Sequence, residues 1–395
     1  MTEHEKPMTK KSNPGPASGI RRSTTILALF LVTLVLHAPT QAAPLSEASN
    51  PVPAAAMKLV QSCMDPKVAL DSQAIATLVD YVLEPKPKRE ADLPKLWKAS
   101  GAYYEFDTRI DFPSFLKYSF SRQIPSVLTS PSSLRYSQWI DQGNSRRISN
   151  ISDLSPSEGQ PIVLRGLEHV GITPDLNTGV YYQYDLKKTL ILLKHKGRQV
   201  LISVSKQADI SDVGKKGFIL GKDDDWNYHY SGEPGSAKAG LGWVKSYIYD
   251  YFSVGVYVST GSSPPAVRSG FFSWIRAGWS GVNFAEPRHV LKGLQRHARS
   301  SKSVLESPRL PAPSQVASSY LKLSALPRNV LADRYAALQQ ARQQLAARKG
   351  NAGNASANRA ETVANIPREQ ILSELMLEYF KTTLGKPSLL ESRGI

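Results

Sequence analysis

The stretch VKSYIYDYFSVGVYV, residues 244–258, decides the fold class. Its apolar side chains recur at every second position, and the side chains of a β-strand point alternately to the two faces of a sheet. The pattern therefore predicts a long strand with one apolar and one tyrosine-bearing face. The apolar face is formed by Ile248, Phe252, Val254, Val256 and Val258, and the other by Tyr247, Tyr249, Tyr251 and Tyr257.

Neighbouring segments carry the same signal. Residues 103–112 alternate as a half-buried strand does, and the apolar runs 190–193 and 200–204 flank Gly197. A glycine supplies the positive φ that a tight hairpin turn needs. All six tryptophans lie within 97–284, and large rings dominate buried area. The sequence thus predicts an α+β protein whose core, 97–284, is an antiparallel tyrosine-rich β-sheet with flanking amphipathic helices.

The flanks of this core are expected to be helical. Residues 43–96 read as a helical segment, with one helix at 66–83, followed by a linker. Residues 285–395 hold 17 basic against 8 acidic residues and form a basic helical region. Apolar residues at helical spacing predict helices there over 286–306, 330–348 and 367–384. A Gly- and Asn-rich stretch predicts a flexible linker at 349–360.

The N-terminus resembles the three-part layout of a secretory signal peptide. An uncharged run of 13 residues, 24–36, follows Arg21 and Arg22 and precedes the small-residue segment 40–43. A helix of that length covers about 20 Å, short of the roughly 30 Å hydrocarbon core of a membrane. We therefore expect 1–42 to be a cleaved signal peptide and the protein to be periplasmic or extracellular. An uncleaved anchor and a cytoplasmic protein with a buried apolar segment are the alternatives.

Composition excludes several classes of protein. A hydrophobic content of 41%, with 26 Gly and 27 Pro, excludes a disordered or collagen-like chain. Cys63 is the only cysteine, so the chain contains neither an internal disulfide nor a CxxC motif. We expect Cys63 to be a small buried side chain, with a catalytic thiol as the alternative.

A weak metal-binding pattern occurs at Asp223, Asp225 and Asn227. Oxygen ligands at alternate positions open a calcium loop because the chain curls around the cation. Tyr228 and Pro234 then stand where that loop requires glycine and a bidentate glutamate. The main interpretation is a solvated acidic loop, with a divalent cation as the alternative. No other cofactor is expected.

Catalytic signatures are missing from the sequence. It contains no G-x-S-x-G, H-E-x-x-H or G-x-x-x-x-G-K motif. The remaining candidate acid/base group is His229 with Asp225 or Glu233. Proton transfer needs such groups within hydrogen-bonding reach of a substrate, which closeness in sequence does not establish.

Two surfaces remain as candidate binding sites. Tyrosine combines a flat apolar ring with a hydroxyl group, which suits glycans and amphiphiles; a sheet face covered by a helix is the competing interpretation. The candidate ligand-binding residues are Tyr247, Tyr249, Tyr251, Tyr257, Trp226 and Tyr228. The basic helix 286–306 suits a peripheral contact with an anionic membrane, and helix 367–384 a contact with a protein partner. Export argues against nucleic acid as a partner.

The leading hypothesis is an exported, non-catalytic protein that binds a ligand or an envelope surface, such as a glycan, a lipid or another envelope component. One alternative is an exported hydrolase, with or without metal assistance, centred on Asp225 and His229. The other is a structural or assembly partner that docks through its C-terminal helices.

Overall fold

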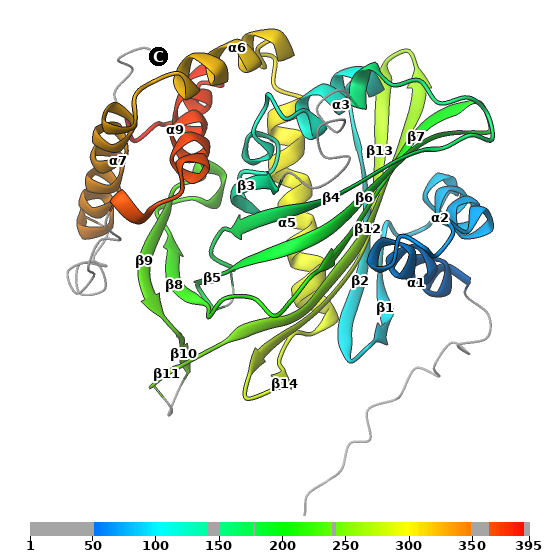
Figure 1. Cartoon of the computed structure of the whole chain (residues 1–395), viewed down its shortest axis with the longest axis horizontal. Helices are drawn as coiled ribbons and strands as arrows, with labels where there is room; N and C mark the ends of the chain where they lie inside the picture. Colours follow the sequence, from blue (N-terminus) through cyan, green and yellow to red (C-terminus); the bar gives the residue numbers. More distant parts are fainter. Residues whose placement is uncertain (1–50, 141–150, 177, 239–241, 349–362, 391–395) are drawn as a thin grey trace, which may run out of the picture. The chain divides into compact units, whose positions relative to one another are not determined.

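The computed structural model describes residues 51–140, 151–176, 178–238, 242–348 and 363–390. They form an α+β fold around a nine-stranded antiparallel sheet that curls into a half-barrel (Figure 1). The fold class predicted from the alternating segments is therefore confirmed. The expected signal peptide, 1–42, and the expected linker, 349–360, lie outside the described residues.

The strands of the main sheet follow the order β1-β2-β13-β12-β7-β6-β4-β3, and β14 pairs with β13. They are β1 (Glu90–Leu96), β2 (Ala99–Thr108), β3 (Leu134–Ile140), β4 (Ile162–Ile172), β6 (Gln183–His195), β7 (Arg198–Gln207), β12 (Tyr247–Ser262), β13 (Pro265–Trp279) and β14 (Val282–Asn283). Smaller sheets contain β5 (Val180–Tyr181), β8 (Lys215–Ile219) and β9 (Tyr228–Pro234), and β10 (Ser236–Lys238) with β11 (Gly242–Val244). The α-helices of the described residues are α1 (Pro51–Met64), α2 (Ser72–Leu83), α3 (Phe112–Phe120), α5 (Pro287–Leu305), α6 (Pro313–Ser324), α7 (Arg328–Arg348) and α9 (Arg368–Thr383).

Helices α1 and α2 cover one face of the sheet, which we call the outer face (Figure 1). Its apolar side chains come from alternate positions of β12, among them Phe252, Val254 and Val256, all 0% exposed. They pack against Leu59 and Val79 of the two helices. Burying an aliphatic or aromatic side chain of this size contributes about 1.5–3 kcal/mol, so this layer anchors the centre of the sheet.

The opposite, inner face of the sheet receives α5. The ring of His297, at the middle of this helix, meets Phe271 of β13 and Phe106 of β2 edge to face, with centroids 5.2 and 6.4 Å apart. The C-terminal helices α6, α7 and α9 continue the same apolar layer with buried residues such as Leu338 and Phe380. The expected basic amphipathic helix 286–306 is thus a sheet-packing helix.

The tyrosines of β12 do not share one face as the alternation predicted. The register moves from Ile248 opposite Ala277 to Asp250 opposite Arg276, so Tyr249 sits in a β-bulge. An extra residue reverses the alternation. Tyr251 and Tyr257 consequently lie on the inner face, whereas Tyr247 and Tyr249 lie on the outer side beside Arg276, the ring of Tyr249 being 4.9 Å from its guanidinium.

Two predicted boundaries shift because aspartates cap helices at other positions. Asp71 accepts the backbone N–H of Ala74 at 2.8 Å, so α2 begins at Ser72 instead of Pro66, and α1 precedes it. Asp111 caps α3 in the same way, through the N–H of Ser114 at 2.8 Å. The strand predicted over 103–112 therefore ends at Thr108 as β2. An N-cap carboxylate satisfies an otherwise unpaired amide of the first helical turn.

A buried ionic network joins α9 to the sheet. Glu374 of α9 accepts hydrogen bonds from Arg135 of β3 at 2.8 Å, from Tyr335 of α7 at 2.9 Å, and from Arg342 of α7. Arg135, Glu374 and Arg342 are only 3%, 2% and 3% exposed. Burial opposes ionisation of Glu374, but the two guanidinium groups outweigh it and lower the pKa of its carboxyl. The C-terminal helices are thereby fixed to the β3 edge of the sheet.

Candidate functional site

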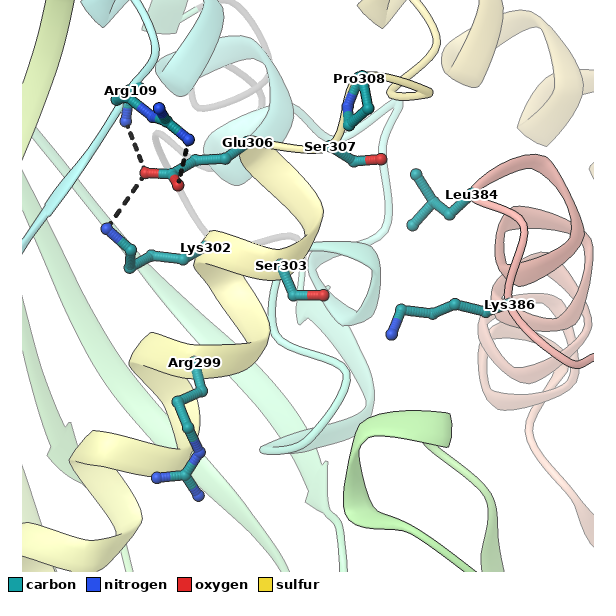
Figure 2. Close-up of a pocket in the computed structure, with 9 residues that line it drawn as sticks. All are labelled: Arg109, Arg299, Lys302, Ser303, Glu306, Ser307, Pro308, Leu384 and Lys386. Carbon is teal, nitrogen blue, oxygen red and sulfur yellow. Dashed lines mark hydrogen bonds and ion pairs between the residues drawn. The ribbon is translucent and has the colours of Figure 1, made fainter.

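A basic cleft of about 590 Å³ lies between the C-terminal end of α5 and the chain that follows α9 (Figure 2). We refer to it as the α5–α9 cleft. Its lining consists of Arg109, Arg299, Lys302, Ser303, Glu306, Ser307, Pro308, Leu384 and Lys386.

The α5 wall of the cleft follows from helical spacing. Arg299, Lys302, Ser303 and Glu306 stand at i, i+3, i+4 and i+7, the positions that share one side of a helix. Val304 lies on the other side of α5 and is fully buried. The helix therefore presents a polar stripe to the cleft while its apolar side packs on the protein.

Glu306 holds one end of this wall together. It accepts the backbone N–H of Arg109 at 3.0 Å, the Arg109 guanidinium at 3.4 Å and the Lys302 ammonium at 3.2 Å. Partial burial would raise the pKa of the Glu306 carboxyl, but these hydrogen bonds and charges lower it overall. Glu306 is thus an ionised partner that positions Arg109 and Lys302, as Figure 2 shows.

The opposite wall is set by a helix C-cap. The N–H of Gly385 bonds to the carbonyl of Thr382 at 3.0 Å and the N–H of Lys386 to that of Lys381 at 2.8 Å, the Schellman pattern that ends a helix. Gly385 has a φ of +74°. Lys386 then bonds to the carbonyl of Asp224 at 2.9 Å, and its ammonium lies 4.2 Å from the ring centroid of Trp226.

Replacing Gly385 with alanine is expected to lower the free energy of unfolding by about 1–2 kcal/mol, because an L side chain is strained at positive φ. The added Cβ would also lie 1.9 Å from Nη1 of Arg309, which must move. Gly293→Ala is the matched control: it lies inside α5 with open space around its Cβ position, so alanine should be neutral or stabilising. Urea unfolding monitored by circular dichroism checks both; an equal loss in the two variants would contradict the C-cap argument.

The electrostatics of the cleft favour an anion. Four cationic side chains line it against the single carboxylate of Glu306, which leaves a formal charge of +3. Arg109 and Lys302 share Glu306, and Lys386 is held by a carbonyl. Arg299 is exposed and has no hydrogen bond or ion pair with any other described residue. Its five guanidinium donors are therefore available to a ligand.

Two of the three candidate metal ligands, Asp223 and Asn227, bind cationic side chains of the protein. Both carboxylate oxygens of Asp223 accept hydrogen bonds from Arg296, at 2.6 and 2.8 Å. The amide oxygen of Asn227 accepts the Lys381 ammonium at 2.7 Å. Among the described residues, no group of three or more His, Cys, Asp or Glu side chains is placed to hold a metal ion.

The three candidate acid/base residues lie outside the α5–α9 cleft. His229 is 4% exposed and stacks on Phe218 with centroids 4.7 Å apart. Burial and the charge of Arg342 lower its pKa to about 4, so the imidazole is neutral at pH 7. Glu233 pairs with Lys216, and Asp225 belongs to the short 3-10 turn η3 (Asp223–Asp225).

The candidate ligand-binding aromatics are dispersed. Trp226 and Tyr228 are 1% and 2% exposed and belong to the core under α5 and α9. Tyr257 packs against Phe115 of α3, with ring centroids 5.1 Å apart. Trp226 nevertheless supports the cleft, because Lys386 lies over its ring.

Cys63 is 5% exposed and contacts backbone carbonyls of β6 and β7, and burial raises its pKa. The expectation of a small buried thiol is confirmed.

No family model matches the chain, and a comparison with curated proteins finds no match. None of the helices formed by the described residues is long and apolar enough to span a bilayer.

Proposed function

We propose that the protein is an exported, non-catalytic binding protein that holds an anionic group of an envelope component in the α5–α9 cleft. The observation that carries this proposal is the guanidinium of Arg299, which has no partner among the described residues and lies beside three further cations. Export rests on the signal-like segment 24–36. Recovery of the chain with residues 1–42 intact from the cytosol would contradict that part.

The chemistry of the lining favours a phosphate group. Arg299 offers a planar fork that matches phosphate oxygens in pairs, and Lys386 adds a point charge from the opposite wall. Ser303 and Ser307 supply hydroxyl donors between them. Pro308 and Leu384 form an apolar margin, which suits a phosphate carried on a larger molecule.

The expected affinity is modest, because the cleft is open to solvent. Exposed cations contribute about 1 kcal/mol each toward an anionic surface, and salt screens them within about 8–10 Å at physiological ionic strength. We therefore expect binding of inorganic phosphate in the millimolar range, tighter binding of a phosphorylated component, and weakening of both as ionic strength rises.

The cleft is tested by titrating the protein with inorganic phosphate and following amide chemical shifts by NMR. Arg299→Ala and Lys386→Ala are each expected to raise the dissociation constant about fivefold to tenfold, since each removes a charge-assisted hydrogen bond. Arg288→Ala is the matched control, an exposed arginine of the same helix that pairs with Glu286 at 2.6 Å. Equal weakening in all three variants would indicate diffuse charge attraction and contradict a cleft site.

A further inference from the structure

A polar row crosses the inner face of the sheet. Residues at directly opposite positions on five successive strands are Gly166 of β4, Lys188 of β6, Ser205 of β7, Ser253 of β12 and Ser273 of β13. We call this set the serine row. Ser203 stands beside it on β7, two residues from Ser205 and opposite Gly255.

The serine row separates two apolar clusters of the same face. On β6, Leu190 belongs to the cluster under α3 and the C-terminal helices, Leu186 belongs to the cluster around Tyr184 and Ile248, and Lys188 lies between them. The same order recurs on β4, β12 and β13, where Leu164, Tyr257 and Val267 lie in or against the first cluster and Val170, Tyr251 and Ile275 in or against the second. The small and polar side chains therefore occupy the middle of the inner face, where an ordinary core would continue with apolar residues.

Three serine hydroxyls in or beside the row have no hydrogen-bond partner among the described residues. Ser203, Ser205 and Ser273 are 7%, 6% and 3% exposed, and none of their side chains has a hydrogen bond with another described residue. Ser253 receives the hydroxyl of Tyr251 at 3.2 Å. Buried polar groups in folded proteins are almost always satisfied, by protein, ordered water or ligand. Ser203 and Ser205 on β7 and Ser273 on β13, with β12 between the two strands, thus place three unpartnered hydroxyls near the middle of this face. Water or a ligand can supply their partners there.

The surroundings of the row are polar but neutral overall. Glu168 pairs with Lys188 at 2.7 Å, so their charges cancel. The imidazole of His297 on α5 packs edge to face on Phe271, two residues from Ser273 on β13, and has no hydrogen bond or ion pair with any other described residue. Burial lowers its pKa to about 4, which leaves it uncharged, with one donor and one acceptor nitrogen.

Aromatic rings flank these polar groups. The ammonium of Lys188 lies 5.3 Å from the ring centroid of Trp139, and Phe271 stands on β13 beside Ser273. Both aromatic side chains retain partial exposure. Hydroxyl groups that both donate and accept, a neutral imidazole and nearby ring faces together match a ligand with many hydroxyls and apolar C–H faces.

We infer that the serine row is a second binding site, separate from the α5–α9 cleft, which takes an uncharged polyhydroxyl ligand of the monosaccharide class. Ser203, Ser205 and Ser273 would exchange hydrogen bonds with its hydroxyls, and Trp139 and Phe271 would contact its C–H faces.

The inference is tested with the full mature chain by saturation-transfer NMR and calorimetry, using glucose, galactose, N-acetylglucosamine and inositol as probes. At least one probe should bind saturably. Ser205→Ala and Ser273→Ala should each raise its dissociation constant about tenfold, as expected when a buried hydrogen bond to the ligand is lost. Ser259→Ala, on β12 outside the row, is the matched control and should bind as the wild type does, as should Arg299→Ala, which alters only the cleft.

Two outcomes would overturn the inference. If none of the four probes binds saturably, water alone satisfies the row. If Ser205→Ala and Ser273→Ala bind a probe as tightly as the Ser259→Ala control, the sugar binds elsewhere. Melting curves of each variant establish that it is folded, and Ser205→Cys provides a second variant of similar volume should an alanine variant fail to fold.

Discussion

Replacing Glu374 with alanine is expected to lower the free energy of unfolding by about 3–5 kcal/mol, because removing one partner of a buried ionic network leaves the others charged and unpaired. Arg135 and Arg342 would keep their buried guanidinium groups without the carboxylate that now lies between them. The network offers no other acceptor to these groups, since Nη1 of Arg135 and Nε of Arg342 already lack hydrogen-bond partners among the described residues. Denaturant unfolding at pH 7 measures the loss.

Glu369→Ala is the matched control for this prediction, since Glu369 lies on the same helix and is partly exposed. It should change the free energy of unfolding by less than about 1 kcal/mol, as surface substitutions usually do. A combined Arg135→Met, Glu374→Leu and Arg342→Met variant should recover most of the stability, because apolar replacements remove the unpaired charges. A loss below about 1 kcal/mol in Glu374→Ala alone would mean that α9 is held by its apolar side chains instead.

Lowering the pH from 6.5 toward 4 is expected to destabilise the protein through His229 and His297. Burial, aided at His229 by Arg342, lowers the pKa of His229 and of His297 from 6.5 to about 4 in the folded chain. Between these values the unfolded chain binds more protons than the folded one, so stability falls as protons are added. Above pH 6.5 the full stabilisation from both neutral imidazoles is present. Between pH 6.5 and about 4 the free energy of unfolding falls with decreasing pH, with a slope that approaches about 1.4 kcal/mol per pH unit for each histidine.

The double variant His229→Gln, His297→Gln separates this effect from the titration of carboxyl groups, most of which lies at lower pH. Its free energy of unfolding should vary far less than that of the wild type between pH 6.5 and 5. His289→Gln controls for the substitution itself on α5, where His289 accepts the backbone N–H of Glu286 at 3.2 Å. An unchanged pH slope in the double variant would rule out the two histidines as its origin.

The sheet could be predicted because its strands alternate in a way that only the β period explains. The turn at Gly197 could also be predicted, and the structure confirms it, since Lys196 and Gly197 both adopt positive φ there. The bulge at Tyr249 could not be predicted, since a single extra residue changes the face of every following tyrosine without altering composition. Cap positions were ambiguous for a similar reason, because Asp65 and Asp71 are equally good N-cap residues in isolation.

Only one wall of the α5–α9 cleft, and no part of the serine row, has a recognisable pattern in the sequence. The stripe from Arg299 to Glu306 has helical spacing and could have been found, but its opposite wall, Lys386, comes from a distant turn. The serine row depends on strand order and register, since its members lie in five strands that are separated along the chain. A set of residues that is brought together only by strand pairing leaves no pattern in any one stretch of sequence. The burial of Cys63, in contrast, could be predicted from the residues next to it.

The two edge strands of the main sheet, β1 and β3, are protected against pairing with another chain. Its two terminal strands carry unpaired amide groups that in many proteins recruit another chain and seed aggregates. Here β1 is interrupted by Pro94, which has no amide hydrogen, and bears the exposed charge of Lys95, while β3 is bordered by α9. Both edges therefore oppose strand pairing between copies of the chain at high concentration. Detachment of α9 from the sheet should uncover β3 and permit fibril-like association at that edge.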